Sequence, residues 1–152
     1  MNYKNNMLRI IDANINRAKE GARVCEDIMR LVVEDKNNTL KLKKIRHAIS
    51  HITKSSKIKQ MDIIQQRNSS SDICKKSRMQ TFKERIPDVF MANSQRIKEA
   101  LRVLEELFCI FDNASSKKFQ NLRFKFYDVE KDCLKKLNIF ETIDKNLPNE
   151  RN

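Results

Sequence analysis

The sequence predicts an all-α protein, a helical bundle built from a duplicated two-helix hairpin with pseudo-twofold symmetry. Three observations support this. The chain of 152 residues has one glycine and two prolines, and it is rich in strong helix formers such as Lys, Leu, Glu and Arg. Its apolar residues recur at spacings of three and four. A polar motif near the start of the chain also returns once at a constant offset.

The repeated motif spans residues 12–28 and returns at residues 91–107, an offset of 79. A repeat that preserved only a fold would keep mainly its apolar positions, but most of the identical positions here are polar. This favours two copies of a group of polar functional residues, which could form the two halves of one site. The identical pairs are Ala13/Ala92, Asn14/Asn93, Arg17/Arg96, Lys19/Lys98, Glu20/Glu99, Arg23/Arg102, Val24/Val103 and Glu26/Glu105.

Each motif lies on a predicted long helix with one apolar stripe, the first at about residues 6–35. A second helix follows in each copy, and here the offset is 77, so we place the two-residue change in loops at 35–39 and 112–117. The first stripe is Ile11, Ile15, Ala18, Ala22, Cys25, Met29 and Val33, and its copy is Phe90, Ser94, Ile97, Leu101, Leu104, Phe108 and Asp112. The second helices carry Leu42, Ile45, Ile49 and Ile52, and Phe119, Leu122, Phe126 and Val129.

These elements predict a single helical domain over residues 1–137. Repeat 1 covers about 7–53 and repeat 2 about 89–135. The linker between them, 54–88, is the least periodic part and has room for a short helix. Residues 138–152 are expected to form a frayed C-terminal tail.

Composition excludes several classes of protein. With one glycine, the chain lacks the residues that a P-loop, a Rossmann unit or a (β/α)₈ barrel requires. The net charge of +12 indicates either a solvated basic surface or an anionic partner. The absence of Trp, and Phe at core spacings, favour small phosphates over nucleic acid. Without a CxxC pair, a signal peptide or a long apolar run, we expect a cytoplasmic protein that does not enter the membrane and keeps reduced thiols.

One flank of each stripe carries candidate binding residues. Asn14, Arg17 and Gly21 lie there in the first copy, and Asn93 and Arg96 in the second. Glycine inside a helix costs about 1 kcal/mol relative to alanine, so Gly21 serves either close helix packing or a ligand against the backbone. The two arginines, at the edge of the core, could converge on one anion, which the planar guanidinium fork suits. Alternatively, Arg17–Glu20 and Arg23–Glu26 form ordinary surface ion pairs.

Two further features leave alternatives open. His47 and His51 stand at i, i+4, a spacing that can chelate a metal, but no third ligand is evident, so Arg46 with His47 in an anion site is the better interpretation. Asp72 follows three serines and would either cap a helix or hold Mg²⁺.

Several segments resemble motifs of a helical domain found ahead of the barrel in bacterial thiamine-phosphate synthases. The segments are residues 9–27 (RIIDANINRAKEGARVCED), 92–106 (ANSQRIKEALRVLEE) and 122–130 (LRFKFYDVE), with residues 45–47 between them. The resemblance implies a stand-alone or excised kinase that uses ATP and Mg²⁺ to convert 4-amino-5-hydroxymethyl-2-methylpyrimidine phosphate to the diphosphate. A thiamine-phosphate synthase barrel, which this chain lacks, would be a partner. Arg67, Asp72 and Ile73 fit the family's linker pattern, whereas Asn68 replaces an acid and Cys74 a glycine.

The expected roles follow from the resemblance together with the residue types. Asn14, Gly21, His47 and Asn93 would contact substrate, Glu20, Asp72 or Glu99 would hold Mg²⁺ or accept a proton, and no protein metal cluster is expected. The phosphate-binding set is Arg17, Arg23, Arg46, Arg96, Arg102 and Arg123.

Two other functions compete with the kinase. One is a non-catalytic module that binds the barrel or a phosphorylated ligand, which the departures at Asn68 and Cys74 favour. The other, motivated only by charge, is a nucleic-acid-binding bundle, whose affinity would fall steeply with salt. The hairpins could pack within one chain or across a homodimer.

Overall fold

The computed structural model describes residues 2–73 and 82–145, except the side chains of residues 143–144, and its regular structure there is entirely helical. The chain forms α1 (Tyr3–Leu31), α2 (Lys36–Ser55), α3 (Gln60–Gln65), α4 (Ile86–Phe111) and α5 (Asn113–Lys145). This confirms the all-α class. None of the helices in these ranges is long and apolar enough to cross a bilayer.

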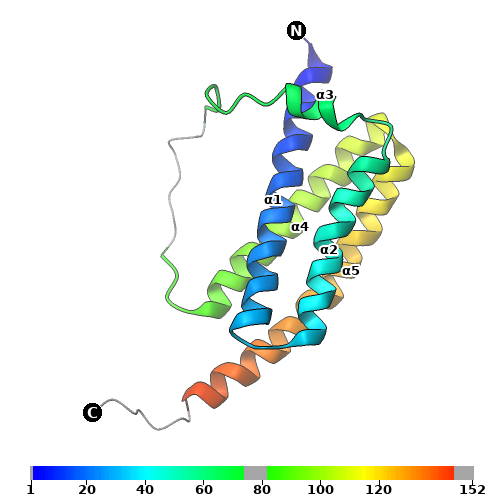
Figure 1. Cartoon of the computed structure of the whole chain (residues 1–152). Coiled ribbons are helices and arrows are strands. Elements are labelled where there is room, and N and C mark those ends of the chain that lie inside the picture. The colour runs from blue at the N-terminus through cyan, green and yellow to red at the C-terminus, as the bar shows by residue number, and fades with distance from the viewer. Residues whose placement is uncertain (1, 74–81, 146–152) are drawn as a thin grey trace.

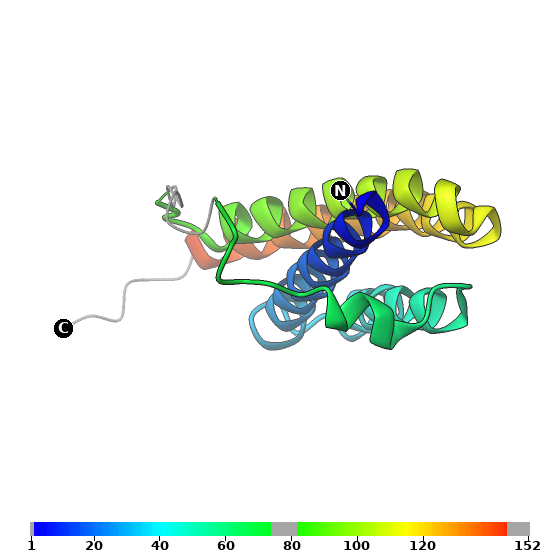
Figure 2. The same cartoon turned by 90° about the horizontal axis from the view of Figure 1, so that it is seen from above.

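The four long helices form two consecutive pairs. α1 packs on α2, and α4 packs on α5, while α1·α4 and α2·α5 contacts join the pairs (Figure 1). Seen from above, α1 runs obliquely to α4 rather than parallel to it (Figure 2). The short α3 lies against α1. The α1–α4 crossing brings the two copies of the repeated motif face to face.

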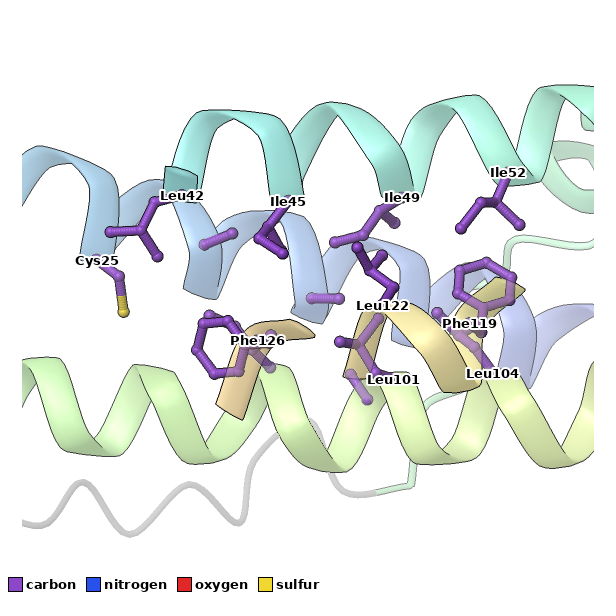
Figure 3. Packing of buried hydrophobic residues seen from close by; sticks show 14 of the residues in the cluster. Cys25, Leu42, Ile45, Ile49, Ile52, Leu101, Leu104, Phe119, Leu122 and Phe126 are labelled. Carbon is purple, nitrogen blue, oxygen red and sulfur yellow. The ribbon is translucent and has the colours of Figure 1, made fainter. Parts of the chain in front are cut away.

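The predicted apolar stripes form the core. Side chains of α2 point towards those of α4 and α5 across the centre of the bundle (Figure 3). Of the stripe positions, only Ile15 and Val33 are half-buried rather than buried. Ser94 and Asp112, the two polar positions in the stripe of the second copy, are also buried. Ser94 donates a hydrogen bond to Glu130 on α5, with 2.5 Å between the oxygens.

The predicted helix ends need correction, because side-chain caps decide them. α2 begins before the predicted loop ends, since the carboxylate of Asp35 accepts a hydrogen bond from the Asn38 amide at 3.1 Å. Residues 113–117 are helical rather than loop, because Asp112 alone separates α4 from α5 and caps α5 through Ser115. The first loop turns at Glu34, whose φ of 56° is a left-handed conformation that non-glycine residues seldom adopt.

The predicted tail also needs correction. α5 continues through residues 138–145, where we expected frayed chain. There Glu141 pairs with Arg85 at the start of α4, with 3.5 Å between their charged atoms. A contact to the bundle therefore accompanies the extra helical turns. Residues 146–152 of that tail lie outside the described residues.

Candidate functional site

A pocket of about 420 Å³ opens beside the α1–α4 crossing. Its volume falls in the range of small-molecule sites. Two side chains of α1 and six of α4 line it, and they include amides, guanidinium groups and one carboxylate. The lining residues are Asn14, Arg17, Ala92, Gln95, Arg96, Glu99, Ala100 and Val103.

Two arginines from different helices meet in this pocket. Arg17 and Arg96 are exposed rather than at the edge of the core as expected. Within residues 2–73 and 82–145, neither guanidinium group has a hydrogen-bond or ion-pair partner, so the alternative Arg17–Glu20 pair does not form. Both groups are therefore available to an anion in the pocket.

The other four predicted phosphate-binding arginines are engaged elsewhere. Arg46 of α2 donates from Nε to the buried Glu26 of α1 at 2.8 Å, and Arg23 lies 3.8 Å from the same carboxylate. Hydrogen bonding to Glu26 raises the pKa of Arg46. An incoming phosphate would have to displace a carboxylate to reach either guanidinium group.

The second hairpin has the equivalent contacts. Arg123 of α5 donates from Nε to the buried Glu105 of α4 at 2.9 Å, and Arg102 pairs with Glu105 at 3.1 Å. Hydrogen bonding to Glu105 raises the pKa of Arg123. These contacts recur at the repeat offsets, as a duplicated hairpin would require, although the duplication itself stays a prediction. Arg46 and Arg123 therefore join neighbouring helices, Arg23 and Arg102 pair within their own helices, and none of the four lines the pocket.

Gly21 lies where α1 packs tightly against α4. A Cβ atom there would stand 3.0 Å from the carbonyl oxygen of Asn93 and 3.0 Å from Cγ1 of Ile97. Gly21 is buried and does not line the pocket, so its placement favours the packing interpretation over ligand contact. The amides of Asn14 and Asn93 each donate back to a carbonyl of their own helix, Ile10 at 2.8 Å and Val89 at 2.9 Å.

Of the three predicted catalytic carboxylates, only Glu99 lines the pocket. It accepts a hydrogen bond from Nε2 of Gln95 at 2.9 Å, which fixes its orientation. Glu20 is exposed on α1, and Asp72 is exposed in the linker; neither lines this pocket. Glu99 suits Mg²⁺, which proteins usually hold through one or two carboxylates together with substrate phosphates.

The remaining predictions concern the histidines and the linker. His47 and His51 are exposed on α2 and line no part of the pocket. No group of three or more His, Cys, Asp or Glu side chains in the described ranges is placed to hold a metal ion. Cys74 lies outside the described residues.

Four residues that make these contacts were not among the predicted site residues: Asp12, Glu26, Gln95 and Glu105. Gln95 orients Glu99, although its position does not keep its identity in the repeat. Asp12 binds Arg67 of the linker through two hydrogen bonds of 2.7 and 2.8 Å, a contact between distant segments that no spacing rule indicates. Glu26 and Glu105 could have been found from the sequence, since both are repeated glutamates beside an apolar stripe.

The pocket thus presents two guanidinium groups without a partner in the described ranges and one carboxylate that accepts a hydrogen bond from Gln95. The chain is similar to thiamine-phosphate synthases of cyanobacteria. It is 35% identical over 144 residues to that of Prochlorococcus marinus strain SARG, covering 91% of this chain and 39% of the relative. With that of Synechococcus sp. strain CC9605 it shares 36% identity over 128 residues, covering 83% and 35%.

The chain matches only a part of each of these thiamine-phosphate synthases. The chain spans little more than a third of the length of these curated relatives. No solved structure matches it. The model of the ThiD2 family matches residues 9–132, a range that includes every residue of the pocket, and the chain therefore belongs to the ThiD2 family.

Proposed function

We propose that this chain acts in thiamine biosynthesis, as a helical domain associated with thiamine-phosphate synthase that binds a phosphorylated pyrimidine. The name of the relatives supports the pathway. The ligand class is supported by one observation: α1 and α4 bring Arg17 and Arg96, both without a partner in the described ranges, to one pocket. Arginine's fork binds phosphate oxygens in pairs.

Within this role we propose a kinase reaction. The domain would transfer a phosphoryl group from ATP to 4-amino-5-hydroxymethyl-2-methylpyrimidine phosphate and so form the diphosphate. A phosphate monoester has a second pKa of about 6, so its oxygen is already anionic at neutral pH. The acceptor thus needs no general base. What the reaction needs is positioning and neutralisation of charge, which are the main requirements of phosphoryl transfer.

The pocket residues suit those two requirements. Arg17 and Arg96 would offset the charge that two phosphorylated ligands bring together. Glu99, oriented by Gln95, would hold Mg²⁺ against the phosphates of ATP. Bound Mg²⁺ would supply further neutralisation at the transferred group. The apolar lining, Ala92, Ala100 and Val103, can accept the face of a planar heterocyclic ring, which a nucleobase and a pyrimidine both have.

A second candidate function is a domain that binds the phosphorylated ligand or a synthase partner without catalysis. One observation favours it: Glu20 and Asp72 do not line the pocket, so only Glu99 is available there as a carboxylate. Asn68, which replaces an acid of the family pattern, forms a turn by accepting from the Ser71 amide at 3.2 Å. In either case the coupling to a thiazole phosphate would require the part of the relatives that this chain does not match.

A coupled ADP-release assay distinguishes the two functions. The purified chain receives MgATP and the pyrimidine phosphate, with the unphosphorylated pyrimidine as the control substrate. We expect turnover with the phosphate alone. Arg17→Ala and Arg96→Ala should each lower kcat/KM by about ten- to a hundredfold, since each removes charge-assisted bonds worth about 1.5–3 kcal/mol.

Arg30→Ala is the matched control. Arg30 is another exposed arginine of α1, it lies outside the pocket, and it has no partner in the described ranges. All three variants should melt within a few degrees of the parent. Ligand binding by calorimetry without turnover would favour the non-catalytic domain, and an absence of ligand binding would overturn every function but the binding of a synthase partner.

A further inference from the structure

The polar residues of the pocket have counterparts at the repeat offset, so the chain carries a second set of the same kind. Its polar residues are Asn14 and Arg17 of α1, and Gln95, Arg96 and Glu99 of α4. At the repeat offset these positions correspond to Asn93 and Arg96 of α4, and Asn16, Arg17 and Glu20 of α1. The chemistry is the same in both sets: two amides, two arginines and one glutamate.

The two sets share their arginines. Arg17 and Arg96 are each other's counterparts at the repeat offset, so both belong to both sets. The amides and the glutamate of one set are different residues from those of the other. We call Asn14, Gln95 and Glu99 the first wing, and Asn93, Asn16 and Glu20 the second wing. The small residues correspond in the same way. Ala100 of the pocket is the counterpart of Gly21, where an added Cβ atom would stand 3.0 Å from the carbonyl oxygen of Asn93 in the second wing.

The local contacts of the wings agree at one position and differ at another. Asn14 and Asn93 make the same bond to the carbonyl four residues earlier. Gln95, however, donates to Glu99, whereas Asn16 donates to Asp12 at 3.5 Å. Glu20 is exposed and has no partner in residues 2–73 and 82–145. The wings therefore offer similar groups held in different ways, which suits two different ligands better than two copies of one.

We propose that the α1–α4 crossing binds two phosphorylated ligands at once, one on each wing, with the phosphates of both converging on Arg17 and Arg96. This rests on the proposed kinase function, in which one ligand is a nucleoside triphosphate and the other a phosphate monoester. The second wing is thus a binding site in addition to the pocket, and Asn16 and Glu20 are its contributions from α1.

The shared arginines suit the chemistry of the transfer. The bond between the γ-phosphorus and its bridging oxygen breaks, and its electron pair leaves with the nucleoside diphosphate. A new P–O bond forms to an oxygen of the monoester, which is already deprotonated at neutral pH because its second pKa is about 6. No proton moves. The transferred group carries charge on its equatorial oxygens throughout, and it passes from one wing to the other between the two guanidinium groups.

Binding measurements test this without relying on turnover. Calorimetry on the full chain would use a non-hydrolysable nucleoside triphosphate analogue with Mg²⁺, the pyrimidine phosphate, and each ligand in the presence of the other. We expect both to bind together. Arg17→Ala and Arg96→Ala should weaken both ligands by about tenfold or more, as expected for losing a charge-assisted hydrogen bond.

The wing variants should act on one ligand each. Glu99→Gln and Gln95→Ala should weaken one ligand about tenfold, and Glu20→Gln and Asn16→Ala should weaken the other by a similar factor. Thermal melting of each variant confirms that it is folded. The proposal is overturned if the two ligands compete, if both sets of variants weaken the same ligand, or if Glu20→Gln and Asn16→Ala change neither affinity.

The outcome is separable from that of the proposed function. Simultaneous binding with wing-specific losses but no turnover would leave the two-wing site standing and remove the kinase. Turnover together with unchanged affinities in Glu20→Gln and Asn16→Ala would keep the kinase and remove the second wing.

Discussion

The guanidinium group of Arg123 donates a hydrogen bond to the buried carboxylate of Glu105, with 2.9 Å between Nε and Oε2. The bond joins α5 to α4, and the Arg46–Glu26 bond joins α2 to α1 in the same way. The side chains of Arg123 and Glu105 are 11% and 7% exposed, so water cannot replace either partner fully. The pair therefore holds the second hairpin together at a position where a lone charge would be costly.

Arg123→Ala should lower the free energy of unfolding by about 3 kcal/mol. Breaking a buried pair by removing one partner typically costs about 3–5 kcal/mol, and the remaining pair of Glu105 with Arg102 keeps the loss at the lower end of that range. Urea denaturation measures the change. Arg85→Ala is the control, because Arg85 pairs with Asp88 and Glu141 at the surface and should cost less than about 1 kcal/mol. Equal losses of unfolding free energy in both variants would mean that the Arg123–Glu105 pair contributes no more than a surface ion pair.

Gly21→Ala should destabilise the protein, although alanine is the better helix former. The propensity gain is about 1 kcal/mol, whereas overpacking a tight contact costs about 1–3 kcal/mol. The new Cβ would meet the backbone oxygen of Asn93, which belongs to a packed helix and cannot rotate away. We expect a net loss of about 1 kcal/mol in thermal or urea unfolding. A gain of about 1 kcal/mol would show instead that α4 moves aside easily.

Asp112 should give the protein part of its acid sensitivity. Hydrogen bonds from the Ser115 hydroxyl and from the Lys57 and Ser115 amides hold the pKa of this carboxyl below its ordinary value. A carboxyl with a lowered folded-state pKa contributes stability above its unfolded pKa, about 3.9, and loses it as the pH falls through the folded pKa. Stability should therefore decline below about pH 4.

Asp112→Asn isolates that contribution. At pH 7 the variant should be less stable by about 1 kcal/mol, since asparagine keeps a cap but loses the charge-assisted bonds. The difference from the parent should shrink as the pH falls below 4. Asp128→Asn serves as the control at an exposed aspartate of α5. A constant difference between parent and Asp112→Asn across the pH range would contradict the assignment.

The described cysteines should differ widely in reactivity towards thiol reagents. Burial raises the pKa of Cys133 from 9.0 to about 12, so its thiolate fraction falls about a thousandfold, and burial raises the pKa of Cys25 further. Cys109 is exposed. In a Cys74→Ser variant, iodoacetamide should label Cys109 rapidly and the two buried thiols only after urea is added. Fast labelling at Cys25 without urea would indicate that the core opens readily.

The sequence predicted the core well because apolar periodicity alone determines which helix face is buried. Leu101, Leu104 and Phe108 are buried as their spacing indicates. Helix ends were less predictable, since they depend on whether a side chain such as Asp112 finds an amide to cap.

The candidate site was predictable only as a group of residues. Nothing in the sequence separated the six predicted phosphate-binding arginines, and only the way the helices meet distinguishes Arg17 and Arg96 from the four that contact Glu26 or Glu105. The Asp12–Arg67 bond joins segments whose proximity no local rule indicates. Local pattern therefore identified the residues, and tertiary packing decided which of them are free.

The order of the helices along the chain has a practical consequence. Each half contains two consecutive long helices, and noncovalent contacts of α1 with α4 and of α2 with α5 join the halves. We therefore expect residues 1–73 and 82–152, produced as separate polypeptides, to reassemble on mixing. Removing the tether makes their association depend on concentration, because a linker supplies an effective concentration in the millimolar range. Reassembled halves would allow one of them to be isotopically labelled alone, so that the signals of Arg17 and Arg96 can be followed in separate spectra.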